Sequence, residues 1–383
     1  MTLVKFGDVV HLCTSRTADP ASAGIDRFVG LEHIEPENLH IRRWGLVADG
    51  TTFTSTFKRG QVLFGKRRAY QRKVAVADFD GVCSSDIYVF ESKDPNVLLP
   101  ELVPFICQSE GLYDFAVKTS AGSLSPRTNW SHLANYEFPL PPVDEQRRIA
   151  DLLWAADNAV TEWKDTLEKL DKLYEAFLED SLSIVQSEGS LFDVDKICKE
   201  VTVGIVINPS KYYADSGVVA ISHSNIFRGE IDITNVSYFT PASHKSLKKT
   251  WLYSGDVVLP RVSTIAGRPY YAAVVPDELN EINAIGIIIL RPDSNKVNPY
   301  YLEAYLNAQS IRRRLVGVAV GSIQRQLNVG IIAKEKVFIP SFEKQNEIAT
   351  KSITFKKNIR QMKEHLDKQV SLKNNLLRHT LTG

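Results

Sequence analysis

Seven basic side chains lie within residues 58–73, a stretch without a single acidic residue. Lysine and arginine neutralise phosphate groups, and arginine also binds the edge of guanine through two parallel hydrogen bonds. The stretch therefore predicts contact with DNA, whereas the alternative is an ordinary solvated, charged surface. The side chains concerned, with one tyrosine among them, are Lys58, Arg59, Lys66, Arg67, Arg68, Tyr70, Arg72 and Lys73.

A second group of cations follows in the other half of the chain, and a polar loop accompanies each group. The second group comprises Lys248, Lys249, Arg261 and Arg268, with a basic run at 312–314 farther on. Each loop opens with a Gly-Ser pair. Hydroxyl, amide and guanidinium groups in such loops can contact phosphates or base edges, although the glycines could simply permit a turn. The loop residues predicted to touch DNA are Ser123, Arg127, Ser322, Gln324 and Arg325.

The sequence shows no catalytic or metal-binding motif. It has no P-loop and no glycine-rich loop leading from a strand into a helix. The Asn-Pro-Tyr-Tyr segment 298–301 superficially resembles the Asn-Pro-Pro-Tyr of amino-methyltransferases, but a helix start is the better interpretation. Glu-Ser-Lys at 91–93 only weakly imitates a nuclease site. The four cysteines form neither a CxxC pair nor a zinc pattern with histidine, so we expect reduced core residues, no metal and no cofactor in this chain.

The composition is that of a globular protein with room for two or three domains. The 383 residues are 44% hydrophobic and 24% charged, with a net charge of +1, so DNA binding must depend on local patches. The longest apolar run, 284–290, is far short of a membrane span and typical of a buried strand. The chain start has no apolar signal core, so we expect a cytoplasmic location.

The chain repeats itself at a spacing of 199 residues. Segments 138–150 and 337–349 each contain an apolar strand, a proline stop and an acidic helix start with Gln and Ile at fixed offsets. The Gly-Ser loops share this spacing, as do Pro100 and Pro299, each expected to open a short helix. We infer two copies of one body, each ending in a long helix.

Both long helices, of about 40 residues each, carry an apolar seam with the alternating steps of four and three that mark a coiled coil. Residues 144–183 contain eleven acidic and five basic side chains, whereas residues 343–380 contain four and nine. Because opposite flanking charge selects partners in coiled coils, we expect the two helices to pair antiparallel. Alternatively, each packs on its own domain or on a second chain. The expected seam residues are Ile149, Leu153, Val160, Trp163, Leu167, Leu170, Tyr174, Ile348, Phe355, Ile359, Met362 and Leu366.

The expected fold class is α+β: two pseudo-twofold-related mixed α/β domains joined by two long helices that form an antiparallel coiled coil. The boundaries that follow from the repeat are 1–143 for the first domain, 144–186 for the central helix, 187–342 for the second domain and 343–383 for the C-terminal helix.

This combination resembles the specificity subunit of type I restriction–modification systems. The resemblance is carried by the helix launch Pro-Pro-Val-Asp-Glu-Gln-Arg-Arg-Ile at 141–149, its second copy through Pro340, Gln345 and Ile348, the Gly-Ser loops, and the strand Gly-Asp-Val-Val at 255–258. It covers the whole chain in the order of the family, with a recognition domain and a conserved helix, each twice.

The resemblance implies that each body is a target-recognition domain for one half of a split DNA sequence and that the helices space the halves. It implies double-stranded DNA, two methyltransferase (modification) subunits and a restriction/translocase subunit as partners. S-adenosylmethionine, and ATP with magnesium for cleavage, would be bound by those partners, and this subunit would catalyse nothing. Because the two bodies differ in their loop residues, the target should be bipartite and asymmetric.

Other functions stay open at this point. The partner could combine methylation and cleavage in one polypeptide, as in a type IIB-like system. The chain could instead be a solitary DNA-modifying enzyme, or a coiled-coil assembly protein without affinity for DNA. Strand patterns encode neither the target bases nor the spacer length.

Overall fold

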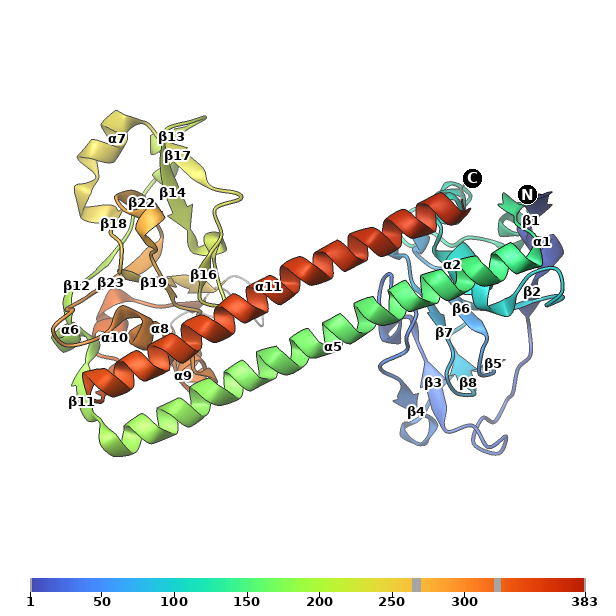
Figure 1. The fold of residues 1–383 in the computed structure, drawn as a ribbon, viewed down its shortest axis with the longest axis horizontal. Coiled ribbons are helices and arrows are strands. Elements are labelled where there is room, and N and C mark those ends of the chain that lie inside the picture. Colours follow the sequence, from blue (N-terminus) through green and yellow to red (C-terminus); the bar gives the residue numbers. More distant parts are fainter. Residues whose placement is uncertain (1, 264–269, 320–324, 382–383) are drawn as a thin grey trace. The chain divides into compact units, whose positions relative to one another are not determined.

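The computed structural model describes residues 2–263, 270–319 and 325–381 (Figure 1). They form two compact units: unit 1 is Met1–Lys164 with Glu364–Gly383, and unit 2 is Asp165–Lys363. Each of the two long helices is divided between the units, with one part in unit 1 and the other in unit 2. The helices are α5 (Val143–Glu188) and α11 (Phe342–Leu381).

Unit 1 stacks helices and two sheets in layers. Its strands are β1 (Thr2–Lys5), β2 (Val10–Cys13), β3 (Arg27–Val29), β4 (Gly45–Leu46), β5 (Ser55–Phe57), β6 (Val62–Gly65), β7 (Val74–Val76), β8 (Gly81–Cys83), β9 (Ile87–Ser92) and β10 (Glu137–Leu140). Its short helices are α1 (Phe6–Val9), α2 (Val103–Gln108), α3 (Glu110–Lys118) and α4 (Trp130–Leu133). The sheets have the orders β2-β9-β6-β7 and β4-β3-β8-β5. Side chains alternate along a strand, so Phe64 joins the cluster under α2 and α3 while Leu63 faces the second sheet.

Unit 2 has the same plan with more strands. The strands are β11 (Ser190–Asp193), β12 (Cys198–Val203), β13 (Tyr213–Ala214), β14 (Val218–Ser222), β15 (Ile226–Phe227), β16 (Glu230–Ile231), β17 (Ser237–Phe239), β18 (Trp251–Leu252), β19 (Val257–Pro260), β20 (Val262–Ser263), β21 (Ala273–Val274), β22 (Ile282–Ile285), β23 (Ile287–Pro292), β24 (Arg325–Gln326) and β25 (Lys336–Ile339). The short helices are α6 (Val194–Ile197), α7 (Pro241–Ser246), α8 (Pro299–Asn307), α9 (Gln309–Val318) and α10 (Val329–Ala333).

The shared topology is the physical basis of the sequence repeat. Sheet β2-β9-β6-β7 of unit 1 corresponds to β12-β23-β19-β21 of unit 2, and the pair β1-β10 corresponds to β11-β25. In the second sheet of each unit one strand pair is parallel, β3 with β8 and β14 with β22. Helix α8 begins at Pro299, and the Asn298 side chain caps it, so the helix-start interpretation is confirmed. Two repeated α+β bodies and two long helices confirm the predicted fold class.

The apolar run 284–290 differs from its prediction as a single strand. Gly286 has a φ of +61°, a left-handed conformation that glycine adopts without steric cost. The chain bends there, so β22 belongs to the five-stranded sheet β13-β17-β14-β22-β18 and β23 to the four-stranded sheet. One apolar run therefore serves two sheets.

A buried glutamine holds the start of each long helix. Gln146 accepts a hydrogen bond from the Leu99 amide at 2.9 Å, and its Nε2 donates to the carbonyls of Val97 at 2.8 Å and Pro141 at 2.9 Å. Its side chain has no solvent exposure. All three partners are backbone groups, so the Gln146 side chain connects the start of α5 to the backbone of the segment before α2.

The same clamp exists in unit 2, 199 residues later. Gln345 is equally buried. It accepts from the Asn298 amide at 2.8 Å and donates to the carbonyls of Lys296 and Pro340 at 3.4 and 3.0 Å. The glutamine of the repeated motif is thus explained by contacts inside each unit.

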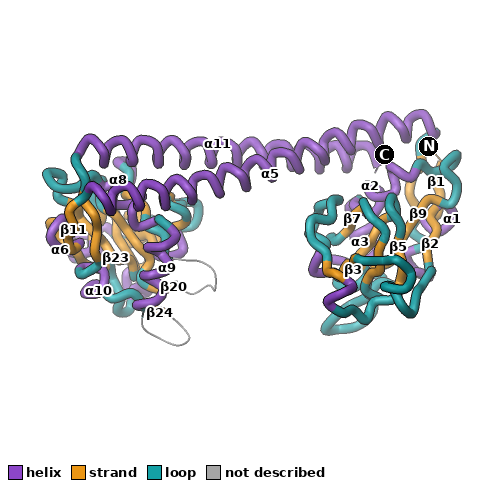
Figure 2. Tube along the Cα trace, turned by 90° about the horizontal axis from the view of Figure 1, so that it is seen from below, coloured by secondary structure: helices purple, strands orange, loops and turns teal. Residues whose placement is uncertain are grey.

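The two long helices run antiparallel within each unit (Figures 1 and 2). In unit 1, Lys373 donates to Asp157, and the rings of Trp163 and His365 lie 4.3 Å apart. In unit 2, the Tyr174 hydroxyl bonds Ser352 at 2.8 Å. Among the expected seam residues Ile149, Leu153, Val160, Ile348 and Ile359 are buried, and Trp163, Leu167, Leu170, Tyr174, Phe355, Met362 and Leu366 are half-buried.

Neither of these helices, nor any shorter one in the part of the chain that is described, has a stretch apolar and long enough to cross a lipid bilayer.

Candidate nucleic-acid interface

In unit 1 the backbone joins two loops that lie 60 residues apart in the sequence. The loop between β6 and β7 meets the segment before α4, because the Arg68 amide donates to the Pro126 carbonyl at 2.7 Å and the Thr128 amide to the Lys66 carbonyl at 3.0 Å. Arg67 and Arg127 form an isolated antiparallel bridge. We call residues 66–71 and 121–128 the unit 1 loop junction. It brings together the first basic group and the first Gly-Ser loop.

Asp86 organises the charge of this junction. The Arg127 Nε lies 2.8 Å and the Arg67 Nη1 3.4 Å from its carboxylate. The second amino group of Arg67 donates to the Ser125 hydroxyl at 3.0 Å. Burial disfavours the charged carboxylate, but the two guanidinium groups outweigh it and lower the pKa of Asp86. Two arginines predicted to bind DNA are thereby fixed in position and partly neutralised.

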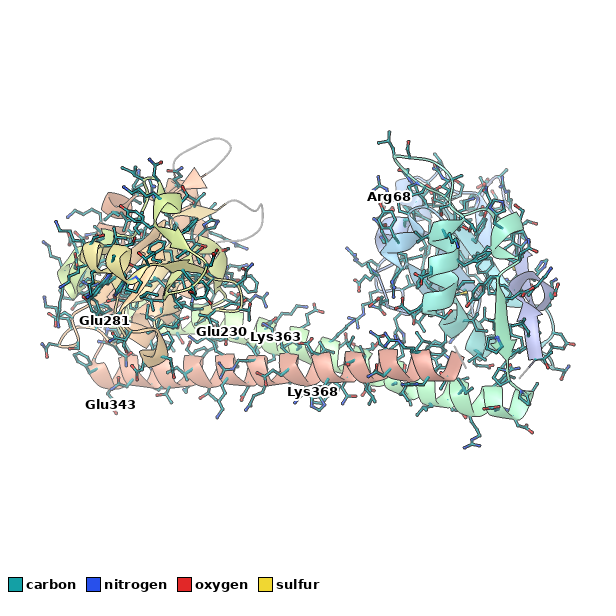
Figure 3. All side chains as sticks on the ribbon, turned by 90° about the horizontal axis from the view of Figure 1, so that it is seen from above. Arg68, Glu230, Glu281, Glu343, Lys363 and Lys368 are labelled. Atoms are coloured by element: carbon teal, nitrogen blue, oxygen red, sulfur yellow. The ribbon has the colours of Figure 1, made fainter. Side chains whose placement is uncertain are left out.

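The turn between Arg68 and Arg72 is strained. Both residues have left-handed backbones, with φ of 54° and 53°, a conformation that costs residues other than glycine free energy. Such strain is found preferentially at ligand-binding sites. Tyr70 on the turn is 55% exposed. Arg68 lies on the side of unit 1 away from the long helices (Figure 3), and its Nε has no partner among the described residues.

The remaining members of the first basic group divide into exposed and engaged side chains. Lys58 and Arg59 are exposed in the turn from β5 to β6. The Lys66 ammonium lies 4.6 Å from the Tyr88 ring centroid, and burial lowers the pKa of Lys66. Lys73 donates to the Leu31 carbonyl at 2.5 Å.

Arg72 is engaged in a different region from Arg68. It forms a two-pronged ion pair with Glu110 at the start of α3, at 2.7 and 2.5 Å. Hydrogen bonding to Glu110 raises the pKa of Arg72 and lowers that of the carboxyl. The Glu110 partner lies 38 residues away, so the sequence run alone gave no sign of it.

Unit 2 has a counterpart of the loop junction. Strands β20 and β24 pair antiparallel, with Val262 opposite Gln326 and Ser263 opposite Arg325. The Leu327 amide donates to the Arg261 carbonyl at 2.9 Å. The predicted DNA contacts Arg268, Ser322 and Gln324 lie outside the described residues. Lys248 and Lys249 lie elsewhere, in the turn before β18.

Two of the three arginines in the basic run 312–314 form ion pairs with acidic residues of the same unit. Arg312 is buried, and its guanidinium binds both carboxylate oxygens of Glu175 on α5, at 2.9 and 2.8 Å. Arg314 pairs with Glu335. Each of these two arginines has an acidic partner that is distant in the sequence.

An apolar side chain at the unit 1 loop junction was not predicted. Leu124, next to the exposed Ser123, is 90% exposed. The Gly-Ser-Leu sequence drew attention only to its polar members. An apolar tip beside cations can contact a thymine methyl group or a base face.

The contacts of Glu91 and Lys93 do not support a nuclease site at the Glu-Ser-Lys segment 91–93. Lys93 donates to the Gly7 carbonyl at 2.5 Å, and Glu91 accepts from Gln61 at 2.7 Å. The exposed Asp80 accepts from the Arg59 amide at 2.8 Å.

Comparison with known proteins gives concordant matches. The family model described as "Type I restriction modification DNA specificity domain" matches residues 28–172. The EcoDI specificity subunit of Escherichia coli is 29% identical over 160 residues, 38% of this chain and 34% of that one. The MjaVIII specificity subunit of Methanocaldococcus jannaschii is 23% identical over 394 residues, 97% of this chain and 85% of that one. The chain thus spans about a third of the first relative and most of the second.

Solved structures share the fold. The type I S subunit from M. genitalium has a TM-score of 0.62 at 15% identity, with coverage of 100% of this chain and 96% of that one. A chain solved for complex assembly and conformational transition of the type I R-M system has a TM-score of 0.55 at 16% identity, with 99% and 97% coverage. Residues 28–172 thus match the type I restriction modification DNA specificity domain, and the chain as a whole is similar in sequence and fold to type I specificity subunits.

Proposed function

We propose that this chain gives a type I restriction–modification complex its DNA sequence specificity, with one unit for each half of a bipartite target. The observation that carries this proposal is the loop junction, which follows the corresponding strands β6 and β19 in the two units but is lined by different side chains. At the bridging positions unit 1 has Arg67 and Arg127, whereas unit 2 has Val262 and Gln326. Two units with the same topology but different contact groups would recognise different half-sites, so the target is asymmetric.

Within unit 1 the side chains divide into two roles. The exposed Lys58 and Arg59 bind phosphates, which fixes the position of the unit on the duplex without reading sequence. Arg68 and Arg127 reach base edges, where a two-pronged contact with guanine discriminates by about 1–3 kcal/mol. Arg67 and Asp86 hold the loops in register, and Leu124 contacts an apolar base surface.

The chemistry of the complex belongs to partner subunits. Two methyltransferase subunits supply S-adenosylmethionine and methylate adenine, and a restriction/translocase subunit cleaves DNA with ATP and magnesium. This chain docks the methyltransferase subunits in the cytoplasm and binds no cofactor of its own. Its curated relatives are type I subunits, so a type IIB-like partner or a solitary enzyme is not favoured.

The phosphate role predicts a specific salt dependence. Replacing Lys58 or Arg59 by glutamine in the complex with the methyltransferase subunits should weaken binding equally on target and scrambled duplexes. Each change should reduce the slope of log affinity against log salt by about 1. Lys5 is exposed on β1, so Lys5→Gln is the matched control and should leave the slope unchanged. A slope unchanged by Lys58→Gln and Arg59→Gln would remove both from the interface.

A substitution at Asp86 should change the preference for target over scrambled DNA, unlike the substitutions at Lys58 and Arg59. Asp86→Asn releases two guanidinium groups from their carboxylate and loosens the junction. Affinity for scrambled DNA should rise, while preference for the target should fall by about tenfold, the equivalent of one lost base contact. Fluorescence anisotropy with both duplexes measures the ratio. An unchanged ratio would mean that the junction does not read bases.

The proposed function is tested by mapping methylated adenines across the host genome. With the chain present, we expect methylation at one asymmetric motif of two parts separated by a fixed spacer. Deleting its gene should abolish that motif alone. Methylation that persists after deletion would exclude the proposed role.

A further inference from the structure

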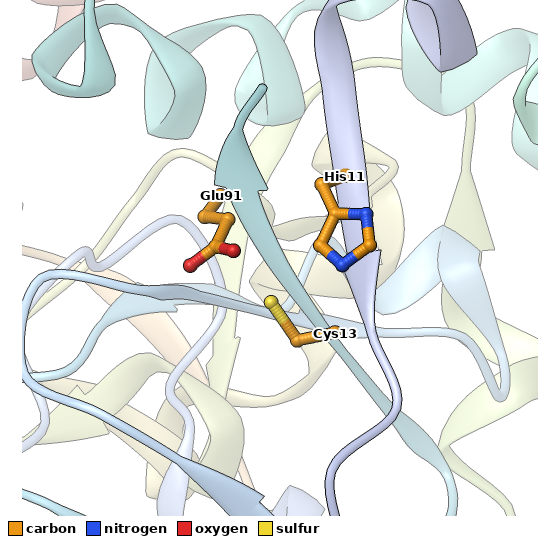
Figure 4. A group of neighbouring side chains, drawn as sticks. All are labelled: His11, Cys13 and Glu91. Carbon is orange, nitrogen blue, oxygen red and sulfur yellow. The ribbon is translucent and has the colours of Figure 1, made fainter. Parts of the chain in front are cut away.

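Three potential metal ligands meet on one face of the first sheet of unit 1. His11 and Glu91 are directly opposite each other in the β2–β9 ladder, and Cys13 follows two residues after His11. Side chains two apart on a strand share a face, so imidazole, thiol and carboxylate point to the same side (Figure 4). Their ligand atoms all lie within 4.8 Å of one another. Such proximity does not follow from spacing in the sequence, where Glu91 is remote.

A glutamine immediately before the neighbouring strand β6 holds two of the three groups. The Gln61 Nε2 donates to Glu91 at 2.7 Å and to the Cys13 sulfur at 3.2 Å. Its own carbonyl oxygen accepts from the Lys58 amide at 2.8 Å, which fixes the orientation of the amide. Support of ligands by hydrogen-bonded neighbours is a regular feature of metal sites.

The corresponding place in unit 2 contains a cation. Asp256 of unit 2 corresponds to Gln61 of unit 1, because each directly follows the glycine before the equivalent strand, β19 or β6. In the strand ladders, Arg291 is opposite Glu200 in unit 2, just as Glu91 is opposite His11 in unit 1. In unit 2 the Arg291 guanidinium lies between the two carboxylates, with its Nε 3.0 Å from Asp256. In unit 1 the same position on the sheet has an acid, an imidazole and a thiol. No positively charged side chain takes the place of Arg291 within the described contacts of these three groups.

We propose that His11, Cys13 and Glu91 bind one zinc ion, with water as the fourth ligand. Thiolate, imidazole and carboxylate together are the ligand set that zinc prefers. Ligand atoms around tetrahedral zinc lie roughly 3.5 Å apart, so small side-chain rotations close the site. His11 and Glu91 are exposed, which leaves the metal accessible to solvent.

Binding exchanges a proton for the metal. Cysteine binds zinc as the thiolate, so the Cys13 thiol must lose its proton when the metal binds. On binding, the S–H bond breaks, a zinc–sulfur bond forms, and the proton passes to the buffer. Because His11 and Cys13 lie on β2 and Glu91 on β9, the ion links these two strands. The link lies beside the turn that contains Lys58 and Arg59.

The test uses the full chain, freed of metal with a chelator and titrated with Co²⁺ and then Zn²⁺. We expect one Co²⁺ per chain with a thiolate-to-cobalt charge-transfer band, displacement by Zn²⁺, and release of one proton per ion. Cys13→Ser should remove the band and the proton release. His11→Ala and Glu91→Gln should each weaken binding by at least about tenfold, the range found for lost ligand support.

The matched control is Cys198→Ala, which removes a thiol from the corresponding strand β12 of unit 2 and should leave the band unchanged. Circular dichroism establishes that each variant is folded. The absence of a band from the unaltered chain, or a band that survives Cys13→Ser, would overturn the proposal. Zn²⁺ should also raise the unfolding midpoint of the unaltered chain and of Cys198→Ala but not that of Cys13→Ser; an equal rise in all three would likewise contradict it.

Discussion

Replacing Asp157 by leucine should lower the unfolding free energy of unit 1 by about 3–5 kcal/mol, the cost of leaving a buried charge without its partner. The Asp157 and Lys373 side chains are 3% and 5% exposed and form an ion pair between α5 and α11. His40 adds a contact to the same carboxylate at 2.9 Å. In the variant the buried Lys373 ammonium loses the carboxylate that it pairs with. Denaturant unfolding followed by hydrogen exchange in residues 143–164 measures the loss.

The double variant Asp157→Leu with Lys373→Met separates charge from packing. Two apolar side chains of similar size remove the unpaired ammonium, so most of the lost stability should return. The matched surface control is Lys351→Met, which breaks an exposed pair with Glu347 on α11 and should cost less than about 1 kcal/mol. If Asp157→Leu costs no more than this control, the long helices are not joined by the buried pair.

The same pair predicts a dependence on pH. Burial opposes ionisation of Asp157, but the hydrogen bond from His40 and the charge of Lys373 outweigh it and lower the pKa of Asp157. A carboxyl whose pKa is lower in the folded state stabilises above its unfolded pKa, and that contribution disappears as the pH falls through the folded value. The difference in stability between the unaltered chain and Asp157→Leu should therefore narrow below about pH 4, near the unfolded pKa of aspartate.

Replacing Gln146 by leucine should destabilise unit 1 by about 1–3 kcal/mol, because the buried hydrogen bond to the Pro141 carbonyl and two part-buried hydrogen bonds to the backbone are lost. The backbone groups concerned are the Leu99 amide and the carbonyls of Val97 and Pro141. Leucine is close to glutamine in size, so the hydrogen bonds are removed with little change in volume. Hydrogen exchange should accelerate at 97–99 and in the first turns of α5.

Gln345→Leu provides the internal comparison. It removes the equivalent three bonds in unit 2, so exchange should accelerate at 296–298 and at the start of α11 while unit 1 stays protected. Gln361→Leu, at an exposed position of α11, should change neither unit. Equal effects of all three variants would show that the clamps do not act locally.

The repeated elements were predictable because backbone rules leave local marks. Proline stops, the glutamine at a fixed offset and the seam of the long helices all recur in the sequence, and each corresponds to a feature of both units. The meaning of the glutamine was not predictable, since its three partners include groups 47 and 49 residues away. A buried Asp157 in the seam was equally hidden, because a charged residue in a helix normally faces water.

The basic groups show the limit of sequence reasoning more clearly. Lys58, Arg59 and Arg72 are alike in the sequence, yet only the first two are exposed. Whether a cation faces water depends on acids brought close by the fold, such as Glu110 for Arg72 and Glu175 for Arg312. A charge run therefore located the loop junction but did not distinguish the side chains free to bind DNA from those that hold the loops.

The central claim is that each unit reads its own half of the target, and exchanging one reader tests it most directly. Residues 190–339 of this chain would be replaced by the corresponding segment of a relative with a different methylation motif, and methylated adenines would then be mapped across the host genome. We expect a hybrid motif in which one half is unchanged and the other half matches the donor. A motif that changes in both halves, or in neither, would contradict the assignment of one half-site to each unit.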